Sequence, residues 1–146
     1  MKLVQIKITN NRNRNNFKII EVSEYMVLYK FAELIVKSFG FYFDHCFGFY
    51  DNLDNPNKST KMFELFTDLE DVEHTPNAMG VKKFYFVSDL FEKNKTMLFL
   101  FDYGESWHFT LELMNKSKKV HKIPKNYYVI YESHGQDPEQ YPPLDE

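Results

Sequence analysis

The sequence predicts an α+β fold, in which one long helix covers one face of a largely antiparallel sheet. Three observations support this prediction. The first residues alternate between polar and β-branched side chains, residues 24–39 carry apolar side chains at helical spacing, and most later apolar segments are short and bounded by turn-forming residues. Aromatic residues, which favour strands, make up 18% of the chain. The whole chain, residues 1–146, is expected to form one domain.

Two strands open the chain. In residues 3–9, Val4, Ile6 and Ile8 alternate with mostly polar residues, which is the two-residue period of a strand with one buried face. Residues 10–16 are all Asn or Arg, and Asn favours turns. Residues 17–22 then predict a second strand. The two strands are expected to form a hairpin with an exposed tip.

Residues 24–39 predict the helix. Ser23 is a suitable N-cap, and Gly40 is a suitable C-terminal stop. Between them, apolar side chains recur at three- and four-residue steps, so one face of the helix is expected to pack on the sheet: Leu28, Phe31, Leu34, Ile35 and Phe39. The resulting β-β-α-β start is compatible with a β-grasp-like arrangement.

The rest of the chain predicts short elements. Strands are expected in four further segments: residues 41–50, 61–66, 84–86 and 127–131. Residues 88–93 predict a helical turn with Ser88 as its cap. Residues 134–146 are polar and proline-rich, so they predict an irregular C-terminal tail.

A central hairpin is predicted around Asp102-Tyr-Gly-Glu-Ser-Trp-His108, which lies between apolar segments. A two-residue turn at Tyr103-Gly104 is preferred, because Gly104 can adopt the positive φ that such turns need. That turn would place Leu98 and Leu100 beside the following strand's Trp107 and Phe109. A three-residue turn would place Phe99 and Phe101 there instead, since a shift of one residue exchanges the two faces of a strand.

This hairpin segment resembles the signature of the plasmid pRiA-type ORF-three-like family, uncharacterised bacterial and archaeal proteins often described as mobile-element passenger proteins. Residues 41–52, with His45, are similar to the family segment that follows its helix, and residues 135–143 are similar to the Pro-Gln-Tyr-Pro ending of one subset. Two positions depart from the family pattern. Phe109 replaces a common histidine, and Glu105 replaces the usual aspartate. The resemblance therefore implies no acid–base or metal site built on that histidine.

Composition restricts the function classes. The net charge is -3, which argues against a protein that binds nucleic acid mainly through phosphates. The single cysteine, Cys46, excludes an intramolecular disulfide. The first residues lack the apolar region of a signal peptide, and no apolar run is long enough to span a membrane, so a cytoplasmic location is expected. No phosphate-binding loop or metal-ligand spacing is present, so no particular cofactor is implied.

Two kinds of site remain open at the hairpin. Asp102, His108 and His45 are candidates for a small acid–base or metal-dependent enzyme, since a carboxylate beside a histidine can orient it and raise its pKa. The favoured alternative is structural, with Asp102 accepting N–H groups of the turn. Tyr103, Trp107 and Glu105 are candidates for a binding surface, although Trp107 is more simply interpreted as a core residue.

Basic residues provide the third candidate site. Arg12, Arg14, Lys118, Lys119 and Lys122 could contact single-stranded nucleic acid, but charged loops are usually only solvated. The sequence therefore favours a non-enzymatic module that binds another macromolecule, with a protein partner or a second copy of the chain preferred over nucleic acid. The small enzyme and the nucleic-acid binder remain alternatives.

Overall fold

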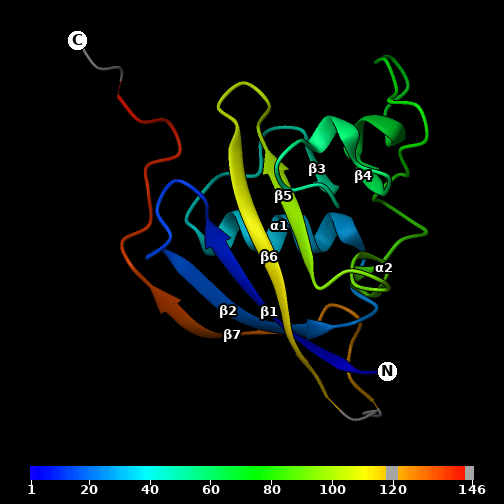
Figure 1. Ribbon diagram of the computed structural model, residues 1–146. Coiled ribbons are helices and arrows are strands. Elements are labelled where there is room, and N and C mark those ends of the chain that lie inside the picture. Colours follow the sequence, from blue (N-terminus) through cyan, green and yellow to red (C-terminus); the bar gives the residue numbers. More distant parts are fainter. Residues whose placement is uncertain (118–121, 144–146) are drawn as a thin grey trace.

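The computed structural model describes residues 1–117 and 122–143, and in these residues seven strands form one sheet. The sheet order is β4-β3-β5-β6-β1-β2-β7, and every neighbouring pair is antiparallel (Figure 1). The strands are β1 (Leu3–Asn10), β2 (Phe17–Ser23), β3 (Phe47–Tyr50), β4 (Met62–Glu64), β5 (Thr96–Phe101), β6 (Trp107–Lys116) and β7 (Tyr128–His134).

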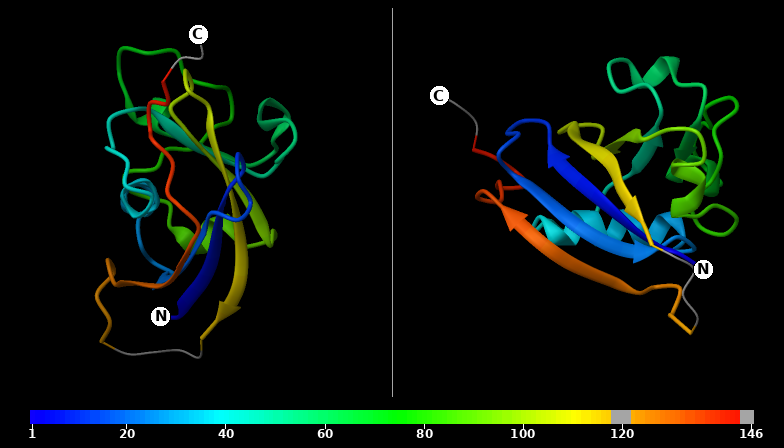
Figure 2. Two further views of the ribbon diagram at one scale, coloured as in Figure 1. Left: turned by 90° about the vertical axis from the view of Figure 1, so that its left-hand side faces the viewer. Right: turned by 60° about the horizontal axis from the view of Figure 1, so that its bottom comes forward.

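The helix α1 (Leu28–Ser38) covers one face of this sheet (Figure 2). Short helical segments are α2 (Val87–Leu90), η1 (Pro56–Lys58) and η2 (Leu65–Asp68). The predicted α+β class is therefore confirmed, and the chain does start with the element order β1-β2-α1-β3. The opening hairpin pairs Val4 with Val22 and Ile6 with Ile20, so both strands bury their β-branched side chains beneath α1.

The predicted helix start is wrong, whereas its end is confirmed. Ser23 is the last residue of β2, and its hydroxyl accepts the N–H of Tyr25 in a turn at 3.1 Å. Residues 24–27 are not helical because their backbone carbonyls accept N–H groups from residues 87 and 88, and Val27 forms a bridge with Phe86. At the other end Gly40 has a φ of +80°, and the N–H groups of residues 40 and 41 bond to the carbonyls of residues 37 and 36.

Several other predicted boundaries also change. The strand predicted for residues 41–50 is shorter than expected: β3 begins only at Phe47, and residues 41–46 are irregular. Of the segment 61–66, only β4 is extended, and residues 84–86 contribute a single bridge. The helical turn begins at Val87, so Ser88 is not its cap, and Asp89 instead accepts the N–H of Phe86 at 2.7 Å. The last strand continues to His134, and irregular chain follows it.

The core lies on both faces of β5. Phe99 and Phe101 join the large cluster beneath α1, whereas Leu98 and Leu100 pack with Tyr50 on the opposite face. Loop residues around Leu53 and Ala78, together with Tyr103, cover this second cluster. A strand that is apolar on both faces was expected to be central, and β5 does lie between β3 and β6.

The preferred register of the central hairpin is wrong. Phe101 lies opposite Trp107 and Phe99 lies opposite Phe109, which is the arrangement that the three-residue turn predicts. Gly104 does not supply the positive φ. Asp102 and Ser106 do so, with φ values of +62° and +56°, and the Ser106 N–H bonds to the Asp102 carbonyl at 2.6 Å. Two non-glycine residues therefore enclose the turn.

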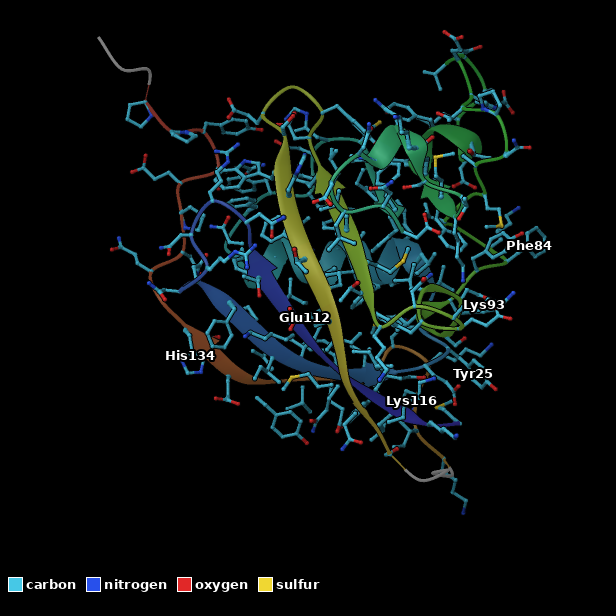
Figure 3. The ribbon with its side chains drawn as sticks, in the orientation of Figure 1. Tyr25, Phe84, Lys93, Glu112, Lys116 and His134 are labelled. Carbon is cyan, nitrogen blue, oxygen red and sulfur yellow. The ribbon has the colours of Figure 1, made fainter. Side chains whose placement is uncertain are left out.

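Trp107 anchors this hairpin in the core. Its side chain is 1% exposed, and its ring lies 4.8 Å from that of Phe41. We expect Trp107→Ala to lower the free energy of unfolding by about 3–5 kcal/mol, measured by urea denaturation, because it leaves a large cavity. Phe84→Ala is the control, since Phe84 is 78% exposed and points into solvent (Figure 3). Equal effects of the two substitutions would contradict a core role for Trp107.

Candidate functional site

Asp102 organises the turn between β5 and β6. One carboxylate oxygen, Oδ1, accepts the N–H groups of Gly104 at 3.1 Å and Glu105 at 3.2 Å. The Asp102 N–H donates to the carbonyl of Cys46 at 2.9 Å, so the turn is also joined to the segment before β3. Burial raises the pKa of the neighbouring Cys46 thiol, which favours its protonated and unreactive form.

The second oxygen of Asp102 faces His45. The Oδ2 atom lies 3.4 Å from His45 Nε2, and Asp44 Oδ1 lies 3.6 Å from the same nitrogen. The Tyr141 hydroxyl donates to Asp44 Oδ2 at 2.8 Å and lies 2.7 Å from His45 Nε2. Because that hydroxyl donates its hydrogen bond to Asp44, its oxygen can accept a hydrogen bond from Nε2–H of His45. The histidine is thus surrounded by acceptors from three segments.

Gln140 fixes the tail beside this group. Its side-chain amide accepts the N–H of Tyr42 at 2.8 Å and donates to the carbonyl of Tyr42 at 3.1 Å and to Asp44 at 3.0 Å. Its main-chain carbonyl accepts the indole N–H of Trp107 at 3.1 Å. We call the five residues Asp44, His45, Asp102, Gln140 and Tyr141 the tail clasp. It joins the three segments that carry the sequence resemblance.

A second attachment holds the tail at Asp137. This carboxylate lies 2.8 Å from the ammonium of Lys18, and it accepts a hydrogen bond from Asn16 at 3.1 Å. The Lys18 side chain is only 5% exposed, so Asp137 supplies the opposite charge beside a buried ammonium. Sequence reasoning missed this pair, because the two residues lie far apart in the chain and Lys18 occupies a position of ordinary polar appearance in β2.

The structure separates the proposed enzyme residues. Asp102 and His45 come together, whereas His108 points to the opposite face of β6 from Trp107, as expected from strand alternation. Burial, followed by the nearby charge of Arg12, lowers the pKa of His108. Within residues 1–117 and 122–143, no three His, Cys, Asp or Glu side chains are grouped so that they could hold a metal ion. A combined site of Asp102, His108 and His45 is therefore not formed.

The other hairpin residues are also engaged within the protein. The Tyr103 hydroxyl lies 2.6 Å from that of Tyr50, which in turn donates to the buried carboxylate of Glu64. The Tyr103 ring packs against Phe66 with 5.0 Å between ring centroids. Burial is the main cause that raises the pKa values of Tyr50 and Tyr103. Tyr103 is half-buried beside Phe66 and Trp107 is buried, so both rings are engaged mainly within the protein.

Arg12 is held at the same end of the sheet. Its guanidinium lies over the Trp107 ring at 3.6 Å from the centroid, donates to the Glu105 carbonyl and lies 3.9 Å from the Glu105 carboxylate. Arg14 and Lys122 are exposed, and they lie on separate loops. Lys118 and Lys119 lie outside the described residues. The predicted basic residues therefore show no common binding surface in the described part of the chain.

The sequence did not predict a groove that lies beside the last strand of the sheet. It lies between α1 and the edge strand β7 and has a volume of about 370 Å³. Its apolar lining includes Met26, Leu34, Tyr128 and Ile130, and the lysines of α1 stand at its rim. Tyr128 is 54% exposed and Ile130 is 40% exposed. The sequence signal that could have located it is Leu34, which continues the apolar pattern of the helix beyond its buried face.

Comparison with known proteins agrees with the sequence resemblance. The model of the plasmid pRiA4b ORF-3-like protein family matches residues 2–140, which include the hairpin, the segment around His45 and the tail as far as Gln140. The chain belongs to this family. Its fold is similar to the crystal structure of protein of unknown function MM3350 from Methanosarcina mazei Go1, with a TM-score of 0.70 and 17% identity over 90% of this chain and 69% of that chain. No match was found among curated proteins.

These comparisons support no specific activity for the family member described here. Within the described residues, no helix combines the length and apolar character that a membrane span requires. The family match ends at Gln140, so it includes the residue that joins the tail to Trp107. The tail clasp therefore contains residues from each of the family-like segments.

The tail clasp makes a first prediction about stability. Gln140 is 8% exposed, and Gln140→Ala removes all of its side-chain hydrogen bonds. We expect a loss of about 1–3 kcal/mol in the free energy of unfolding and faster proteolysis of the tail. The matched control is Glu139→Ala, which changes an exposed neighbour. If Gln140→Ala were as stable and as resistant as the control, the tail would not be held by this side chain.

The clasp also predicts a response to alkaline pH. The pKa of Tyr141 is raised from 10.0 to about 12, mainly because the Tyr141 hydroxyl donates a hydrogen bond to Asp44. The resulting stabilisation is present below pH 10 and is lost as the pH rises through 12, because only the protonated hydroxyl can donate. Stability should therefore fall more steeply with alkaline pH in the wild type than in Tyr141→Phe. If the free energies of unfolding of the two proteins, measured by urea denaturation, fell equally with pH, the proposed role of the Tyr141 hydroxyl would be refuted.

Proposed function

We propose that this chain is a non-enzymatic, cytoplasmic protein-interaction module that binds a partner in the groove between α1 and β7. The tail clasp is then a structural element that fastens the C-terminal segment across the hairpin. The observation that carries this proposal is the contrast between the two regions. The reactive side chains of the clasp are bonded to one another, whereas Tyr128 and Ile130 in the groove remain 54% and 40% exposed among the described residues.

The clasp supports a structural role through its hydrogen bonds. A general acid or base needs a side chain that can reach the proton of a substrate. In the clasp, Asp102 bonds to its own turn and faces His45, and Asp44 bonds to Gln140 and Tyr141. Apart from the bond within the turn, each of these contacts joins two distant chain segments. Their shared effect is to attach the tail to the sheet.

The groove supports a binding role through its exposed apolar surface. Ligand sites are mostly apolar hollows with a few polar groups, and a volume of about 370 Å³ falls in their usual size range. Leu34, Tyr128 and Ile130 together expose apolar surface to water within the groove. Apolar patches of this kind mark interaction sites, since their exposure is otherwise unfavourable.

The proposal can be tested with a phage-displayed random peptide library. We expect the library to yield peptides that bind the wild type at least about tenfold more tightly than Leu34→Glu, since a charge in the groove opposes apolar burial. The fold should tolerate this change, because Leu34 lies one helical turn from Lys30 and Lys37. Equal thermal stability of the two proteins checks this point.

A control variant separates the groove from the rest of the surface. Phe84→Ser removes an exposed aromatic side chain far from the groove, so the selected peptides should bind it as they bind the wild type. Peptides that bind Leu34→Glu as tightly as the wild type would contradict the groove as the interaction site. Failure to select any peptide would contradict the proposed function as a whole.

A further inference from the structure

We propose that the groove accepts a short extended segment, which adds as a strand to β7 and carries both an apolar and an acidic side chain. This inference rests on the proposed function and names the partner class for the same site. It follows from three properties of the edge strand and the helix beside it: unpaired main-chain groups, a limited length of regular strand and a basic rim.

The outer edge of β7 presents backbone hydrogen-bonding groups that no other described strand pairs with. This strand is last in the sheet order, and no described strand lies beyond it. The Ser23 N–H bonds to the Tyr127 carbonyl at 3.3 Å, so the carbonyl of Tyr127 points toward β2. Backbone groups alternate in direction along a strand, and therefore those of Tyr128 and Ile130 point away from the sheet. An added strand can bond to both residues.

A bulge limits the length of the pairing surface. Ile20 lies opposite Ile130, but Ile19 lies opposite Glu132, so Tyr131 is an extra residue in β7. Bulges bend an edge strand and interrupt its ladder. Regular pairing is thus available only up to Ile130, which fits a short peptide segment. Edge-to-edge pairing of two copies along the whole of β7 is disfavoured for the same reason.

The side chains beside this edge select an apolar residue. Tyr128 and Ile130 lie opposite Val22 and Ile20, which are buried beneath α1, so all four side chains point to the helix side of the sheet. A residue of the added strand that points to the same side would enter the groove and contact Leu34. The residues next to it in the segment would point to the other face.

The rim adds a preference for carboxylates. Lys30 and Lys37 on α1 are 53% and 63% exposed, and both lie 3.5 Å from the single carboxylate of Glu33. Two lysines that share one glutamate leave a net positive charge beside the groove. Charge complementarity therefore favours a segment with an acidic side chain two residues from the apolar one, since residues two apart share a face.

The probe is a set of terminally blocked heptapeptides, with Thr at the even positions and Val, Leu, Glu or Lys at the odd positions. We expect the tightest members to combine Val or Leu with Glu and to bind at least about tenfold more tightly than their Glu-to-Lys counterparts. The double variant K30E/K37E should reverse this charge preference. A preference that is unchanged by K30E/K37E would overturn the proposed role of the rim.

The added strand is tested with a matched pair of variants. Ile130→Pro removes the outward N–H without removing a bond to β2, whereas Ile130→Ala shortens the side chain and keeps the N–H. We expect Ile130→Pro to bind the best heptapeptide at least about tenfold more weakly than Ile130→Ala. Amide hydrogen exchange of the wild type gives an independent measurement, because the N–H groups of residues 128 and 130 should become protected on binding.

The outcomes distinguish this inference from the proposed function. If Leu34→Glu abolishes binding but the amides of residues 128 and 130 gain no protection, the groove is a binding site and the added strand is refuted. If no heptapeptide and no phage-displayed peptide binds the groove, both proposals fail. If native mass spectrometry shows a dimer that Ile130→Pro dissociates, a second copy occupies the edge and the peptide proposal is overturned.

Discussion

The backbone conformation of Asp102 is the constraint on which the rest of this structure depends. A positive φ at a non-glycine residue is unfavourable by about 1–3 kcal/mol, and here two such residues enclose one turn. Hydrogen bonds from Gly104 and Glu105 to the Asp102 carboxylate compensate for this. The turn they stabilise determines which side chains of β5 and β6 face α1. It therefore places Phe99, Phe101 and Trp107 in one core.

The same residue connects the hairpin to the rest of the chain. Its amide bonds to Cys46 before β3, and its remaining carboxylate oxygen faces His45. Tyr141 completes this group from the tail, while Trp107 holds Gln140 through its indole N–H. A change in the hairpin register would move Trp107 to the other face of β6 and remove the donor that the tail carbonyl requires. Core packing and tail attachment are thus two results of one register.

Local patterns could predict the elements whose structure depends on local interactions. The alternation in β1 and β2 and the glycine at residue 40 were sufficient, because a strand period and a helix stop are short-range properties. The helix start was misplaced because the backbone of residues 24–27 bonds to residues 86–88, far along the chain. Of the site, Asp102 and His45 were identified as candidates, but Tyr141 of the tail, which lies beside His45, was not. The ion pair of Lys18 with Asp137 has no local pattern at all.

The two ends of the sheet differ in what they leave unsatisfied, and this difference connects the fold to its proposed use. At β4 the edge is short and covered by the loop around Met79, which both accepts and donates backbone hydrogen bonds there. At β7 the edge keeps two residues with outward backbone groups next to exposed apolar side chains. An open edge of this kind favours unwanted association unless its length is limited. The bulge at Tyr131 supplies that limit, so the edge suits a short partner segment and opposes pairing between long strands.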